Sequence, residues 1–253
     1  MKSGDIMDYD KIVEIWRKKE IKDSSDLSII LDSYSVNFAY NSCKIENDDI
    51  TYYDTREIFD KDGVTSYTGS LRNLFEIQNA KIAYKKVLEA FDSKRSLNEE
   101  FVKEIQKCLT RGTYDDIRYQ KDERPGEYKK HDYVTGIHEV GASSEDVKEE
   151  MRELLDEMQV IEDKDVLISA AYFHAKFENI HPFSDGNGRV GRMLMNYILL
   201  MHNHPPIIIY EEDKKEYYKA LEEFDTNIEI NKLVSFLKKE CEKTWKLWIK
   251  NSE

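Results

Sequence analysis

The chain has 253 residues, of which 35% are charged and 40% hydrophobic, a composition typical of a soluble globular protein with a sizeable core. Its formal net charge of -13 argues against binding to nucleic acid or to an anionic membrane, because either surface attracts a basic patch. No apolar run approaches the length of a membrane span, and the polar start lacks the apolar core of a signal peptide, so we expect a cytoplasmic protein.

Apolar residues recur at helical spacing through the first part of the chain. They predict a short helix up to about residue 26 and a second helix over about residues 27–47. Capping-box patterns beginning at Thr51 and at Ser96 predict two further helix starts. Between them, a stripe of apolar residues over 74–91 predicts a longer helix.

The helical period disappears between residues 112 and 142. There, residues 133–140 are predicted to form a short hairpin or two extended pieces. Amphipathic helices are predicted again over residues 147–158 and 166–177, followed by a loop that opens into a helix and by two more helices. No internal repeat or linker interrupts the pattern, so we expect one compact helical unit.

Residues 181–192, HPFSDGNGRVGR, gather an imidazole, a carboxylate, closely spaced glycines and two arginines where this last loop meets its helix. The unpaired N–H groups at a helix N-terminus favour phosphate, and guanidinium groups beside them strengthen that preference. The alternative is a solvated loop with a glycine-rich helix start, and the presence of all these groups together argues against it. We therefore predict a polyphosphate site formed by Gly186, Asn187, Gly188, Arg189 and Arg192.

The same residues match the Fic family pattern H-P-F-x-(D/E)-G-N-G-R-x-x-R at every fixed position, so the chain resembles a Fic protein. The resemblance implies an all-α, Fic-type helical fold with a small β-hairpin flap. It also implies transfer of AMP from ATP to a tyrosine, threonine or serine hydroxyl of a target protein, with release of pyrophosphate. The corresponding parts of the chain are an N-terminal helical region (1–95), the Fic core (96–240) and the end of the last helix (241–253).

Transfer of a nucleotidyl group requires a hydroxyl to lose its proton as it attacks the α-phosphorus. Imidazole titrates near neutral pH, so we assign His181 as the general base, a role worth about a hundredfold to ten-thousandfold in rate. Asp185 offers the hard oxygen ligand that Mg²⁺ shared with the phosphates prefers. His174, on the same helix face as His181, could suggest a two-histidine metal site, but we expect it to be a buried, hydrogen-bonded residue.

The remaining motif residues are assigned to the phosphates of ATP. Asn187 and the N–H groups around Gly186 and Gly188 would hold the α-phosphate and stabilise its developing charge. Arg189 and Arg192 would hold the β- and γ-phosphates.

Residues 42–47, SCKIEN, fit a second family pattern, (S/T)-x-x-x-E-(G/N), which resembles the inhibitory helix of Fic proteins. Ser42 and Glu46 project from one helix face, with Asn47 directly after them. By analogy with the family, Glu46 pairs with Arg192, displaces the γ-phosphate and leaves ATP in an unproductive pose. The alternative is an exposed helix end with a solvated glutamate.

The predicted hairpin resembles the Fic flap, which holds an extended segment of the target. Lys129 stands where the family usually has arginine, and residues 143–144 are serines where proline is frequent. An exposed strand edge would bind a peptide through main-chain hydrogen bonds, although an ordinary surface hairpin is the alternative. The flap residues are Tyr133, Val134, Thr135, Gly136 and Ile137.

Other functions remain open at this point. The same site could remove AMP from a modified protein, with Glu46 positioning a water, or could transfer another nucleotide or phosphate-linked group. A non-catalytic nucleotide-binding module is disfavoured because His181, Asp185, Asn187 and Arg192 are all present. The expected partners are ATP and a protein target, which includes the chain itself through autoadenylylation. The sequence leaves the oligomeric state open and is compatible with a homo-oligomer.

Overall fold

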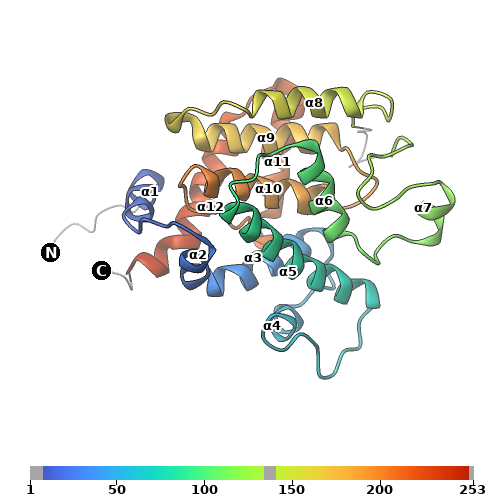
Figure 1. Ribbon diagram of the computed structural model, residues 1–253, viewed down its shortest axis with the longest axis horizontal. Helices are drawn as coiled ribbons and strands as arrows, with labels where there is room; N and C mark the ends of the chain where they lie inside the picture. The colour runs from blue at the N-terminus through green and yellow to red at the C-terminus, as the bar shows by residue number, and fades with distance from the viewer. Residues whose placement is uncertain (1–7, 134–140, 251–253) are drawn as a thin grey trace.

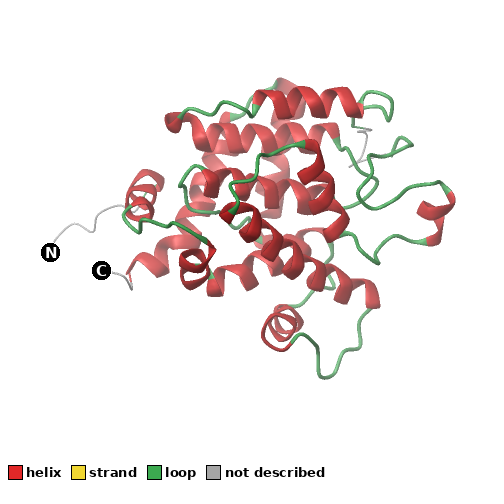
Figure 2. Ribbon diagram, viewed as in Figure 1, coloured by secondary structure: helices red, strands yellow, loops and turns green. Residues whose placement is uncertain are grey.

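The computed structural model describes residues 8–133 and 141–250, with side chains described as far as residue 246. Within these residues the chain forms helices joined by loops (Figures 1 and 2). The helices are α1 Tyr9–Arg17, α2 Ser24–Ile30, α3 Asp32–Glu46, α4 Tyr52–Lys61, α5 Leu71–Asp92, α6 Glu99–Leu109, α7 Asp116–Gln120, α8 Val147–Glu157, α9 Val166–Ile180, α10 Asn187–Met201, α11 Lys214–Asn227 and α12 Asn231–Lys250, with short 3₁₀ turns at Asp163–Asp165 and Glu211–Asp213. The predicted all-α class is confirmed.

Helix α10 is the centre of the core. It packs along α9, and α3, α5 and α6 contact it from other sides (Figure 1). Its residues from Val190 to Leu200 are all buried, because after the first turn the helix is almost entirely apolar and needs cover around its whole circumference. The start of α10, where the twelve-residue motif lies, is therefore held firmly in the middle of the protein.

The N-terminal helices differ from the prediction in their boundaries. The first helix ends at Arg17 rather than near residue 26, and the helix expected over about residues 27–47 is two helices that meet at Leu31. Asp23 caps the first of these two by accepting hydrogen bonds from the N–H groups of Ser25 and Asp26. The break leaves both Leu27 and Leu31 in the core.

Helix caps show how far local sequence determines these boundaries. Thr51 accepts a hydrogen bond from the N–H of Asp54 at 3.1 Å, as its capping box predicts. The capping box expected at Ser96 is wrong, because Asn98 accepts from the N–H of Phe101 at 2.9 Å and α6 begins at Glu99. Asparagine and serine are similarly good caps, so two candidates this close together are not separated by sequence alone.

The predicted hairpin falls mostly outside the described residues. Val134, Thr135, Gly136 and Ile137 lie in the stretch 134–140, of which the structure gives no description, so the flap stays a prediction. Tyr133 is described, and its hydroxyl donates to a carboxylate oxygen of Glu123 at 3.0 Å. No strand occurs in the parts of the chain on either side of this stretch. In the same parts, no helix has both the length and the apolar character that crossing a membrane requires.

Candidate active site

A cavity of about 460 Å³ lies at the N-terminus of α10. Its walls come from the ends of α3 and α9, the beginnings of α5 and α11, and the loop between α9 and α10. The lining residues are Glu46, Asn47, Arg72, Glu76, Glu178, His181, Ser184, Asp185, Gly186, Asn187, Gly188, Arg189, Arg192, Tyr217 and Tyr218. All the predicted catalytic, metal-binding and phosphate-binding residues line this one cavity. A larger groove of about 720 Å³ beside α1 and α12 contains none of them.

The loop before α10 is folded tightly onto the start of the helix. Helix α9 ends at Ile180, His181 takes the left-handed conformation with φ 51°, and Gly186 takes it again with φ 86°. The side chain of Asn187 forms two hydrogen bonds with the backbone of the buried Phe183: its Oδ1 accepts from the N–H at 2.9 Å and its Nδ2 donates to the carbonyl at 2.7 Å. The amide of Asn187 thus shapes the loop, and its contact with the α-phosphate stays a prediction.

His181 is partly buried between this loop and the segment that leads to the predicted flap. Burial lowers the pKa of its imidazole to about 4, and the nearby charge of Lys129 acts in the same direction. The backbone N–H of Lys129 donates to the carbonyl of Pro182 at 2.9 Å, which ties this lysine to the residue after His181. The imidazole is therefore neutral at physiological pH, the form that a general base needs.

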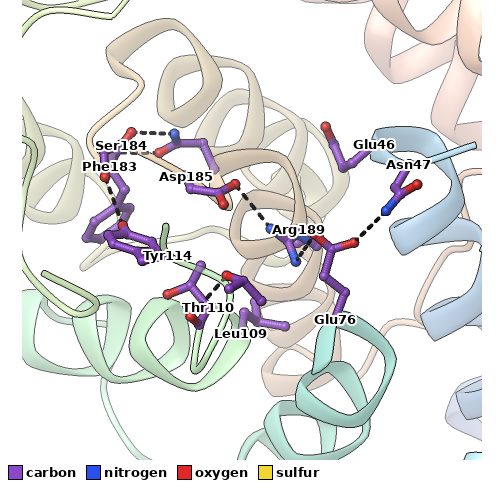
Figure 3. Close-up of polar contacts among 12 residues, drawn as sticks. Glu46, Asn47, Glu76, Leu109, Thr110, Tyr114, Phe183, Ser184, Asp185 and Arg189 are labelled. Carbon is purple, nitrogen blue, oxygen red and sulfur yellow. Dashed lines mark hydrogen bonds and ion pairs between the residues drawn. The ribbon is translucent and has the colours of Figure 1, made fainter. Parts of the chain in front are cut away.

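Asp185 lies between two guanidinium groups. Its Oδ2 accepts from Arg72 at 2.8 Å. Its Oδ1 accepts from Arg189 at 3.2 Å (Figure 3). Arg189 is only 3% exposed, yet its Nε and Nη1 have no hydrogen-bond partner; its nearest other carboxylate, on Glu76, is 3.7 Å from Nη1. Buried donors left unpaired at the wall of a cavity match the acceptor oxygens of a phosphate.

Arg192 contacts the end of α3. Its Nη2 donates to Glu46 Oε1 at 2.7 Å and to the carbonyl of Ser42 at 2.8 Å, and its Nε donates to Ser42 Oγ at 3.1 Å. The predicted pair of Glu46 and Arg192 is thus present. A Cβ on Gly188 would lie 2.2 Å from Glu46 Oε1, so the carboxylate reaches this position only because residue 188 is glycine. Next to it, Asn47 Nδ2 donates to Asn73 Oδ1 at 3.0 Å and to Glu76 Oε2 at 3.1 Å.

The cavity also contains residues that the sequence did not single out: Arg72, Glu76, Glu178, Tyr217 and Tyr218. Burial raises the pKa of the Glu178 carboxyl to about 8, and its Oε1 has no hydrogen-bond partner. Lys176 and Asn179 also lie near the end of α9, so no local pattern set Glu178 apart in the sequence. Arg72 and Glu76 form an ion pair one turn apart at 2.9 Å, a common pattern on exposed helices that did not point to a site.

His174 is buried and shares a hydrogen bond of 2.7 Å between its Nε2 and the hydroxyl of Tyr217, as expected of a structural histidine. Tyr217 in turn lies 3.5 Å from Nη1 of Arg192. In the described stretches, no cluster of three or more histidine, cysteine or acidic side chains could hold a metal ion. A magnesium ion here would have Asp185 as its protein ligand and would depend on phosphate oxygens and water for the rest, as it usually does.

Residues 96–199 match the family model described as Fic/DOC family. These residues form a Fic domain. A Fic domain containing signaling protein from Bacteroides thetaiotaomicron has the same fold with a TM-score of 0.80, 26% identity, and coverage of 96% of this chain and 95% of that one. Fic-1 from C. elegans shares the fold at a TM-score of 0.75 with 21% identity, over 96% of this chain and 73% of that chain.

Curated relatives match a shorter part of this chain. The protein adenylyltransferase Fic of Drosophila persimilis is 41% identical over 80 residues, which is 32% of this chain and 16% of that protein. The protein of the same name from Nematostella vectensis is 41% identical over 75 residues, or 30% of this chain and 17% of the relative. The match thus spans about a sixth of the length of these relatives.

Proposed function

We propose that this protein is a protein adenylyltransferase, which transfers AMP from ATP to a hydroxyl side chain of a protein target and releases pyrophosphate. The observation that carries the proposal is the position of a neutral His181 in one cavity with the N-terminal turn of α10, Asp185 and two buried arginines. The names of the curated relatives support the same reaction.

In this proposal each motif residue has one role. The neutral imidazole of His181 takes the proton from the attacking hydroxyl. The N–H groups at Gly186 and Gly188 face the phosphate chain at the positive end of the helix dipole, and the unpaired donors of Arg189 bind phosphate oxygens. Asp185 would hold Mg²⁺, which, when bound with ATP, neutralises charge on the phosphates.

We further propose that Glu46 holds the enzyme in an inhibited state. Arg192 is 2% exposed and its guanidinium is already occupied by Glu46 and Ser42, so it is not available to the terminal phosphates of ATP. Glu46 belongs to the last turn of α3, and its side chain is 36% exposed. Displacement of this one side chain would remove the carboxylate that pairs with Arg192, while the hydrogen bonds to Ser42 stay in place and the core stays folded. The target protein then includes the chain itself, through autoadenylylation.

Removal of AMP from a modified protein is the second candidate. The observation that favours it is that Glu46 lines the same cavity as His181, where its carboxylate could position a water molecule for attack on the AMP–protein bond. This activity would need Glu46, whereas AMP transfer would be restrained by it.

Labelled ATP separates these candidates. The protein is incubated with magnesium and ATP labelled in the α- or the γ-phosphate, alone and with a cell extract as the source of targets. Protein labelled from the α position only, and lost in His181→Ala but kept in His131→Ala, supports AMP transfer. His131 is the matched control because it is exposed and lies outside the cavity. Label from the γ position would reject adenylylation, and release of AMP from a prelabelled protein would identify the second candidate.

A further inference from the structure

Arg72 stands out among the arginines of the cavity because it comes from α5, outside the residues that match the Fic/DOC model. Its guanidinium bridges two carboxylates: Nη2 donates to Asp185 Oδ2 at 2.8 Å and Nε donates to Glu76 Oε1 at 2.9 Å. It therefore joins the N-terminal region of the chain to the predicted metal ligand.

Arg72 is also the most exposed of the three arginines that line the cavity. Its side chain is 41% exposed, whereas those of Arg189 and Arg192 are 3% and 2% exposed. If Arg72 turned away, neither of its carboxylates would be left without a partner. Asp185 would keep Arg189 at 3.2 Å, and Glu76 would keep the amide of Asn47 at 3.1 Å.

Two carboxylates in the cavity would repel a polyphosphate, and the positive charge of Arg72 would offset this repulsion. A polyphosphate at the start of α10 would bring several negative charges close to Asp185 and Glu76, both of which line the same cavity. Without Arg72, the buried Arg189 would be the one guanidinium described beside both carboxylates. A second guanidinium at this position offsets the repulsion, and its planar fork can form paired hydrogen bonds with phosphate oxygens.

We infer that Arg72 is an additional phosphate-binding residue, which pairs with Asp185 in this structure and moves to the phosphate chain when ATP binds. This inference rests on the proposed function, because it assumes that the cavity takes a nucleotide polyphosphate. It also gives the N-terminal region a direct part in ligand binding. Magnesium coordination by Asp185 and release of Arg72 toward the phosphates would then favour each other.

Calorimetric titration tests the inference with ATP, inorganic tripolyphosphate and adenosine as probes. Glu46→Gly is the parent, because it removes the carboxylate that pairs with Arg192, and it is compared with the same protein carrying Arg72→Ala, Arg72→Lys or Arg56→Ala. Arg56 is the matched control: it also pairs with an acidic residue four positions along its helix, its side chain is 66% exposed, and it lies outside the cavity. Thermal melting confirms that each variant is folded.

Arg72→Ala is expected to weaken binding of ATP and tripolyphosphate about tenfold, the effect of losing one charge-assisted contact, while adenosine binding stays unchanged. The affinity of Arg72→Lys for ATP and tripolyphosphate should lie between those of the parent and Arg72→Ala. Arg56→Ala should bind both as tightly as the parent does. Equal losses for ATP and adenosine, or no loss for ATP, would overturn the inference and leave the proposed function standing. If the parent binds neither ATP nor tripolyphosphate, the proposed function itself fails.

Discussion

Glu178 has a buried carboxyl at the wall of the cavity, and one of its oxygens has no hydrogen-bond partner. Burial raises the pKa of this carboxyl from 4.5 to about 8, so the native protein keeps it protonated where the unfolded chain does not. Between these two values the native state binds more protons than the unfolded state, and the free energy of unfolding must fall as the pH rises. Glu178→Gln, which cannot ionise, removes this penalty.

The pKa shift sets the size of the effect. A pH of about 7 lies about 2.5 units above the pKa of this carboxyl in the unfolded chain. Each unit adds about 1.4 kcal/mol to the free energy needed to protonate it. The product, about 3.5 kcal/mol, is an upper limit, since the side chain keeps 17% of its surface exposed. Glu178→Gln is therefore expected to stabilise the protein by about 2 to 3 kcal/mol at about pH 7, and to have little effect at about pH 4.5.

Urea unfolding at these two pH values measures the difference directly. Glu153→Gln is the matched control, because it removes the same charge from an exposed position on α8 and should be neutral at both pH values. A Glu178→Gln protein whose stability differs from the wild type by the same amount at both pH values would refute the reasoning, because the effect would then not come from ionisation.

Two further predictions concern the motif itself. Because burial lowers the pKa of His181 to about 4, the rate of AMP transfer should persist as the pH falls through about 6.5 and decline only near the lowered value; a transfer rate that halves near pH 6.5 would contradict this. Asn187→Ala removes both hydrogen bonds to the backbone of the buried Phe183 and should cost about 2 to 4 kcal/mol in urea unfolding; a loss below about 1 kcal/mol would show that the loop does not depend on them.

The features predicted correctly from the sequence are those that depend on short spacings. The imidazole, the carboxylate, the glycines and the arginines of residues 181–192 are adjacent in the chain, so a loop opening into a helix brings them together. The resemblance to Fic proteins also predicted the contact of Glu46 with Arg192, which are distant in sequence. Residue spacing alone gave no reason to pair them.

The features that the sequence did not predict depend on competing local signals or on tertiary placement. Helix α6 has two good cap candidates, and the structure uses Asn98 rather than Ser96. Arg72 and Glu76 form an ordinary ion pair along α5, and they become part of the site only because the start of that helix lies against the loop at Asp185. No local sequence pattern predicts such a contact between distant parts of the chain.

We propose above all that this protein transfers AMP and that Glu46 restrains the transfer. The most direct measurement is self-labelling with α-labelled ATP and magnesium in the wild type, in Glu46→Gly and in Glu46→Gly combined with His181→Ala. Glu157→Gly serves as the matched control, because this exposed glutamate is the last residue of α8 as Glu46 is of α3. We expect strong labelling of Glu46→Gly, weak labelling of the wild type and of Glu157→Gly, and none of the double variant. Labelling of Glu46→Gly no stronger than that of the wild type would contradict the inhibitory role, and labelling that survives His181→Ala would contradict the assigned base.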